Sequence, residues 1–243
     1  MLATPHPRQV TLLSTFDTPG RQVMLTNLCA SLAHLGSDTL LIDGRRFPRL
    51  ASHMGLPRRA SLLDVISGHS HLADAVQSLE AGFALATLNN GRQSAFSHLG
   101  HLSVLEALST RFSTVLIDAE LDEQDQLPIA ELEQSQIVVQ VSADAESIKA
   151  GYALIKRLHR SLGQIQCGVL VTGAEEHRAR LIYANLAQTA RRYLAVSLND
   201  MGSIPSDDHL GRAARLGRAV IDAFPLALAS VAFRRVAGQL SII

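Results

Sequence analysis

A glycine followed by a charged side chain marks the first stretch of the sequence that could do chemistry. Residues 14–28 read STFDTPGRQVMLTNL; they follow an apolar stretch at 10–13 and lead into an apolar helical pattern. Phosphate-binding proteins keep the pattern G-x-x-x-x-G-K-[ST] in such a loop, because its backbone N–H groups and its lysine hold phosphates. Gly20, Arg21 and Gln22 stand where that pattern has glycine, lysine and a hydroxyl residue. The position suits phosphate binding, whereas the side chains depart from it.

Two aspartates follow apolar runs of the same kind. Asp43 ends the run in LLIDG, and Asp118 ends the run in VLIDA. Ligands of parallel α/β sheets bind at the carboxyl ends of the strands. Aspartate also ends strands as a turn former or helix cap, so either residue alone leaves both roles open. Their shared pattern, downstream of the loop at 14–22, favours a nucleotide-type site.

These residues need a scaffold, and the apolar runs predict one in which strands and helices alternate. That alternation implies right-handed crossovers and a mostly parallel twisted sheet flanked by helices. We see no linker or repeat, so we expect one α/β domain over residues 1–243. The predicted strands are 10–14, 39–42, 83–88, 114–117, 137–141, 168–172 and the extended segment 195–204; the predicted helices are 23–35, 145–162, 175–194, 208–216 and one after residue 225.

The composition agrees with such a domain. The chain is 47% hydrophobic but 4% aromatic, which suits aliphatic helices packed on a sheet. Lys and Arg total 22 and Asp and Glu total 22, so no net field attracts nucleic acid or anionic lipid. The start of the chain does not resemble a signal peptide, and no run approaches the ~18 apolar residues of a spanning helix. We expect a cytoplasmic protein in which Cys29 and Cys167 are buried thiols rather than a disulfide.

Other groups of polar residues give weaker signals. The histidine pairs at 69/71 and 98/101 lack further ligands at zinc spacing, so no metal site is expected. The acids at 120–125 are interpreted as a solvated loop or helix start. Dispersed arginine pairs are typical of solvated faces, and we expect no strong nucleic-acid binding.

The order of these motifs resembles the MinD/ParA family of deviant-Walker P-loop ATPases, and within it the FlhG (FleN) branch. The resemblance is strongest in AESIKAGYALIKRLHR at 145–160 and in the closing segment 178–225, which contains an Ile-Pro-x-Asp turn at 204–207. It covers nearly the whole chain and implies a P-loop NTPase fold.

The resemblance also assigns roles to single residues. The family's K-G-G-x-G-K-T falls on residues 16–22, where Phe16 replaces the signature lysine, Arg21 the P-loop lysine and Gln22 the threonine that holds Mg²⁺. Asp17 and Thr18 replace glycines that wrap the phosphate. The resemblance implies a water-orienting, catalytic role for Asp43. It implies cofactor-binding roles for Gly20, Arg21, Gln22, Asp118, Thr172 and Pro205.

These departures predict a degenerate Walker A loop. Efficient hydrolysis of ATP is not expected, and weak binding of ATP and Mg²⁺ through Gly20, Arg21 and the helix N-terminus stays open. The resemblance implies a regulatory pseudo-ATPase that controls flagellar number, placement or gene expression through a flagellar regulator or a basal-body or C-ring protein. Two alternatives remain open: a slow ATPase switch that cycles as a homodimer, or an accessory of cellulose synthesis or pilus assembly.

Membrane recruitment is a weaker expectation. The family tends to end in a membrane-targeting amphipathic helix. Here Leu228, Val231, Ala232, Val236 and Leu240 lie near one face of the last helix, and we interpret that face as core packing. Peripheral placement at the cell pole or membrane therefore stays open for a protein expected in the cytoplasm.

Overall fold

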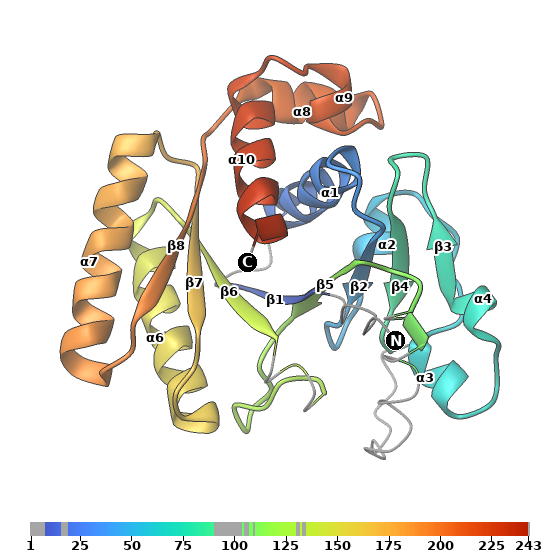
Figure 1. Cartoon of the computed structure of the whole chain (residues 1–243), viewed down its shortest axis with the longest axis horizontal. Coiled ribbons are helices and arrows are strands. Elements are labelled where there is room, and N and C mark those ends of the chain that lie inside the picture. The colour runs from blue at the N-terminus through green and yellow to red at the C-terminus, as the bar shows by residue number, and fades with distance from the viewer. Residues whose placement is uncertain are drawn as a thin grey trace, which may run out of the picture.

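An eight-stranded sheet forms the centre of the computed structural model (Figure 1), which describes residues 8–15, 19–89, 104, 107–108, 110–129, 132 and 135–242. The strand order is β3-β4-β2-β5-β1-β6-β7-β8, and neighbouring strands are parallel except for the antiparallel pair β3–β4. The strands are β1 (Arg8–Ser14), β2 (Thr39–Asp43), β3 (Val76–Ser78), β4 (Ala84–Thr87), β5 (Thr114–Ala119), β6 (Gln136–Ser142), β7 (Cys167–Thr172) and β8 (Leu198–Ile204).

Helices cover both faces of the sheet. Helices α6 and α7 pack together on one face, while α1 and α10 pack together on the other (Figure 1). The described helices are α1 (Pro19–His34), α2 (Leu50–His53), α3 (Leu62–Ile66), α4 (Leu72–Ala75), α6 (Ala145–Leu162), α7 (Glu176–Leu194), α8 (Asp208–Arg215), α9 (Val220–Ala223) and α10 (Leu228–Ile242).

The α/β class and the predicted strands are confirmed. The long helices also lie where the periodicity placed them, within a few residues at their ends. The sequence did not predict β3 or the short helices α2, α3, α4 and α9, which have three to five residues each. Elements this short contain too few residues to show a period.

Two hydrophobic clusters hold the layers together, one on each face of the sheet. In β2, Leu40 and Ile42 face the α6–α7 side, while Leu41 packs with α1 and α10. Asp43 follows the same alternation and shares the face of Leu41; Asp118 in β5 likewise shares the face of Leu116. Both aspartates are therefore directed towards the layer that contains α1. Cys29 and Cys167 are buried free thiols, as predicted.

The last helix corrects one prediction. Val236 and Leu240 are buried in the core between α10 and the sheet, as expected. Leu228 and Val231 are 71% and 45% exposed, so the apolar face near the start of α10 is not core packing. A helix carries core residues on about one side only, and the first turns of α10 present apolar residues on the other side as well. Within the described residues, no helix is long and apolar enough to span a membrane.

Candidate functional site

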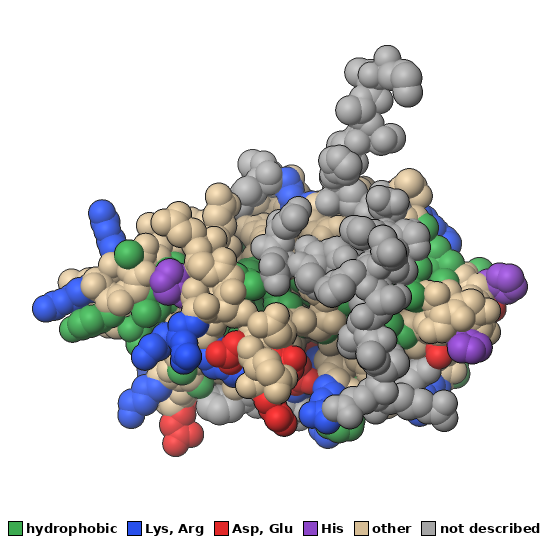
Figure 2. Space-filling model, turned by 90° about the horizontal axis from the view of Figure 1, so that it is seen from below, with side chains coloured by type: hydrophobic (Ala, Val, Ile, Leu, Met, Phe, Trp, Pro, Cys, Tyr) green, Lys and Arg blue, Asp and Glu red, His purple; other side chains and the backbone are tan. Residues whose placement is uncertain are grey.

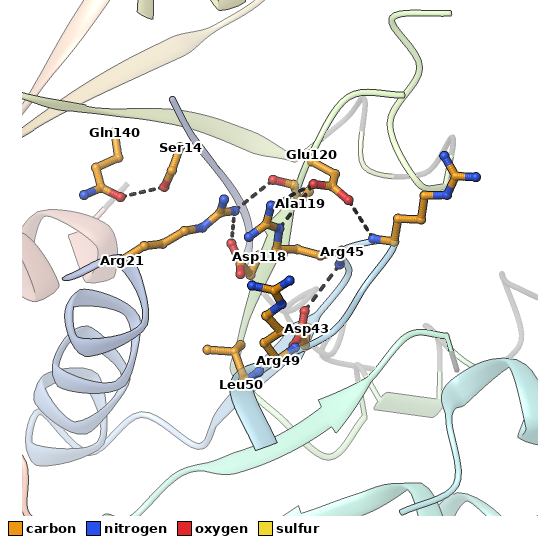
Figure 3. A network of polar contacts seen from close by, with 11 residues as sticks. Ser14, Arg21, Asp43, Arg45, Arg49, Leu50, Asp118, Ala119, Glu120 and Gln140 are labelled. Atoms are coloured by element: carbon orange, nitrogen blue, oxygen red, sulfur yellow. Dashed lines mark hydrogen bonds and ion pairs between the residues drawn. The ribbon is translucent and has the colours of Figure 1, made fainter. Parts of the chain in front are cut away.

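Arg21 lies in the first turn of α1 and turns inward rather than towards solvent (Figure 3). Its Nη2 donates to Oδ1 of Asp118 and, at 3.0 Å, to the carbonyl oxygen of Ala119 at the end of β5. The side chains of Arg21 and Asp118 are each only 2% exposed. Gly20, one residue earlier, is exposed. The cation predicted to meet phosphate therefore forms a buried ion pair with an acid of its own chain.

The environment of Asp118 sets its acidity. Burial raises the pKa of Asp118 to about 6; the guanidinium of Arg21 opposes that rise, and the carboxylate of Asp43 adds to it. Asp43 and Asp118 are register partners on the neighbouring strands β2 and β5, which explains their mutual repulsion. The pairing places two acids side by side at the carboxyl edge of the sheet.

The carboxylate of Asp43 is engaged by the backbone that follows β2. Its Oδ2 accepts the N–H groups of Arg49 at 2.7 Å and Leu50 at 2.8 Å, where α2 begins, and its Oδ1 accepts the N–H of Arg45 at 3.4 Å. Burial raises the pKa of Asp43, and these hydrogen bonds together with the charge of Arg45 oppose the rise. In this arrangement Asp43 acts as a cap that holds the loop between β2 and α2.

Glu120 joins this edge of the sheet, although the sequence analysis interpreted it as part of a solvated loop. One of its oxygens accepts from Arg45 Nε at 3.2 Å and Nη2 at 2.9 Å, and the other accepts the backbone N–H of Arg46 at 2.7 Å. Asp125 similarly pairs with Arg157 of α6 at 2.5 Å. The partners are 75 and 32 residues apart, so no local pattern in the sequence announces these pairs.

Thr172 and Pro205 lie elsewhere along the edge. Thr172 ends β7 and pairs in register with Ile204, the residue before Pro205. A chain of hydrogen bonds links this end to the first strand, because Gln140 of β6 contacts Ser14 at 2.6 Å and Thr172 at 3.2 Å. Thr172 and Pro205 are therefore neighbours of one another, but they are not part of the group around Arg21 and Asp118.

Four further residues belong to the loop that the family uses to bind phosphate. Gln22 is half-buried in the first turn of α1. Phe16, Asp17 and Thr18, which fall on the family's phosphate loop, lie outside the described residues.

A cavity of about 340 Å³ opens beside the ion pairs of Arg21 and Arg45. Ser14, Arg21, Arg45, Glu120, Leu154 and Arg157 are among its lining residues. Acidic and basic side chains lie next to one another on the face of the molecule seen from below (Figure 2).

Comparisons with known proteins agree with the fold and the sequence motifs. No family model matches the chain. Antiactivator FleN from Pseudomonas aeruginosa is 29% identical over 244 residues, which cover 97% of this chain and 87% of FleN. MinD from Aquifex aeolicus, also solved in a complex with MinC, superposes with a TM-score of 0.71 at 20% identity and covers 96% of both chains. MinD from Pyrococcus horikoshii, solved with Mg-ADP, superposes with a TM-score of 0.69 at 16% identity and covers 97% of this chain and 96% of its own.

The chain resembles the MinD/ParA proteins in fold and FleN in sequence. Its sequence is similar to that of FleN along almost the whole chain, whereas it shares with the solved MinD structures the fold.

Mg-ADP is bound in the Pyrococcus horikoshii MinD structure, and the residues at the corresponding edge of this sheet differ from what such a ligand needs. Magnesium prefers carboxylate and water oxygens in octahedral geometry. The carboxylate of Asp43 accepts backbone N–H groups here, and Oδ1 of Asp118 already bonds a cation, the guanidinium of Arg21. Among the described residues, no three His, Cys, Asp or Glu side chains form a group that could hold a metal ion. As arranged, these residues do not fit a Mg²⁺–nucleotide complex.

Proposed function

We propose that this protein of MinD/ParA fold is a regulator of flagellar number, placement or gene expression that acts through protein contacts without hydrolysing ATP. The relation to a protein named antiactivator supports regulation, because it extends over 97% of the chain. Control through a flagellar regulator or a basal-body protein is the form of regulation that the FlhG-type resemblance suggests. Placement of the protein at the cell pole or on the membrane is not needed for this mode of action.

The observation that carries the proposal is the state of Asp43. A residue that orients a water for attack must have a carboxylate oxygen directed at that water. Both oxygens of Asp43 instead accept backbone N–H groups of residues 45, 49 and 50, and the side chain is buried. The residue therefore supports the loop at the end of β2, and the degenerate sequence at 16–22 supports the same conclusion independently.

Protein contact is the mode of action that remains when hydrolysis is removed. A chain that keeps the MinD/ParA scaffold keeps the large helical surfaces that a partner can bind. The Aquifex relative, solved in a complex with MinC, illustrates that the scaffold carries partner surfaces. A homodimer that does not cycle on nucleotide is compatible with this proposal.

Genetic replacement in the host bacterium tests the proposal. The gene would be deleted and then replaced by the wild type or by Asp43→Asn, with flagella counted by electron microscopy and protein abundance measured by immunoblot. We expect deletion to change the number of flagella and Asp43→Asn to restore it, since an amide retains one acceptor for the loop. An unchanged flagellar number after deletion would overturn the regulatory role. ATP hydrolysis by the purified wild type that Asp43→Asn abolishes would overturn the non-enzymatic mode.

A further inference from the structure

Three acids that follow or end β5 are each paired with an arginine from a different element. Asp118 pairs with Arg21 of α1, Glu120 with Arg45 after β2, and Asp125 with Arg157 of α6. Only the first of these pairs is buried on both sides, at 2% exposure for each side chain. It therefore has the strongest electrostatic consequence, since solvent screens the other two pairs.

The Arg21–Asp118 pair lies where a positive charge is needed to stabilise two neighbouring carboxylates. Asp43 and Asp118 are register partners on parallel strands, and each raises the energy of the other's charge. Two adjacent buried carboxylates remain ionised only if a positive charge lies beside them. Among the described residues at this edge, the cation that meets Asp118 directly is the guanidinium of Arg21.

We propose that the Arg21 guanidinium is the resident cation of this edge, and that with it in place Asp118 does not serve as a ligand of a divalent metal ion. This inference rests on the proposed function, because a regulator that does not hydrolyse ATP has no need of an exchangeable Mg²⁺ ion. Its consequence is specific: the folded state of this edge is independent of divalent cations.

The chemistry of arginine suits this role better than that of lysine. Nη2 of Arg21 carries two N–H groups, and it contacts both the Asp118 carboxylate and the Ala119 carbonyl. Arginine also stays charged at every physiological pH, whereas a buried lysine loses its proton readily. Nε of Arg21 is buried without a hydrogen-bond partner in the described part of the chain. The guanidinium therefore contacts the acid and the carbonyl in a position that leaves its Nε–H without an acceptor.

Binding of Mn²⁺, followed by electron paramagnetic resonance on the purified full-length chain, tests the proposal. The variants are Arg21→Met, which keeps the apolar stem without the charge, Asp118→Asn, and the two combined. We expect the wild type and Asp118→Asn to give the same weak, non-specific titration at millimolar Mn²⁺. We expect Arg21→Met to bind Mn²⁺ at least about tenfold more tightly, and the double variant to lose that gain.

Two results would overturn the proposal. One is binding of Mn²⁺ by the wild type that Asp118→Asn abolishes; the other is a folded Arg21→Met that gains no affinity for Mn²⁺. If Arg21→Met does not fold, the comparison of wild type with Asp118→Asn decides alone, because equal titrations support the proposal and unequal ones contradict it. None of these readings depends on flagella or on ATP hydrolysis, so failure here and failure of the proposed function are distinguishable.

Discussion

Replacing Arg21 by methionine is the perturbation with the largest expected effect on stability. The change removes the cation from a pair whose side chains are each 2% exposed, and so leaves the Asp118 carboxylate buried beside Asp43. Removing one partner of a buried ion pair costs about 3–5 kcal/mol, because the remaining charge is uncompensated. For a chain of this size, ~2–4 °C per kcal/mol translates that loss into a fall in Tm of roughly 6–20 °C.

The pH dependence of that loss follows from Asp118. Burial holds the folded pKa of Asp118 at about 6, above its ordinary value of 3.8, and Arg21 is the strongest influence that lowers it. Removing Arg21 therefore raises the pKa of Asp118 further. A raised carboxyl pKa means that the folded state binds a proton before the unfolded state does, so stability falls as pH rises from about 4 through the folded pKa. We expect Arg21→Met to be less destabilised at pH ~5 than at pH ~8.

Urea denaturation followed by circular dichroism at these two pH values measures both effects. Arg180→Met is the matched control, because Arg180 forms an exposed pair with Glu176 whose side chains are 65% and 59% exposed. Exposed pairs contribute about 0–1 kcal/mol, so the control should change little. A loss for Arg21→Met no larger than that of the control would refute the reasoning. A loss that grew as the pH fell would also refute it, since the sign would be reversed.

Three further predictions concern other residues. Asp43→Ala should lower the free energy of unfolding by about 1–3 kcal/mol, measured by the same urea assay, because it removes the carboxylate that accepts two backbone N–H groups at the start of α2; an unchanged stability would contradict its capping role. Asp207 accepts N–H groups from both α8 and α10; burial acts against its charge, but these hydrogen bonds and His209 lower its pKa overall. The stability that the Asp207 carboxylate gives is therefore present above its unfolded pKa and is lost as the pH falls through its folded pKa. Asp207→Ala should then lower the free energy of unfolding by about 1–2 kcal/mol at pH ~7 and by less at pH ~3. A loss that did not depend on pH would contradict this role of Asp207. Restoring the phosphate loop should raise ATP affinity in a fluorescent-nucleotide assay, and no gain would show that the departures extend beyond the loop; the five changes are Phe16→Lys, Asp17→Gly, Thr18→Gly, Arg21→Lys and Gln22→Thr.

Local patterns in the sequence were sufficient to predict the parallel strands and the long helices. Apolar runs predict strands because each run is short, continuous and bounded by turn residues. The placement of Asp43 and Asp118 at strand ends follows from the same runs, and the parallel sheet then brings them together as register partners. The short elements β3, α2, α3, α4 and α9 were missed because three to five residues cannot show a period.

The direction of Arg21 could not be predicted from the sequence. A cation after a glycine at a helix start is equally compatible with a phosphate ligand and with an acid of the chain. Its partner Asp118 lies 97 residues away, and the choice depends on how closely α1 approaches β5. Glu120 was missed for the same reason, since Arg45 is 75 residues away. The exposed Leu228 and Val231 show the converse limit, because an apolar pattern does not reveal which sides of a helix are covered.

Titration of the purified wild-type chain with ATP and Mg²⁺ by calorimetry, with its mass in solution followed by light scattering, tests the central claim most directly. A regulator whose Asp43 and Asp118 are engaged by its own backbone and by Arg21 should give no saturable heat at millimolar ATP and no change of mass. Saturable binding accompanied by dimer formation would contradict the account, and would mean that Arg21 leaves Asp118 to serve a nucleotide-driven switch.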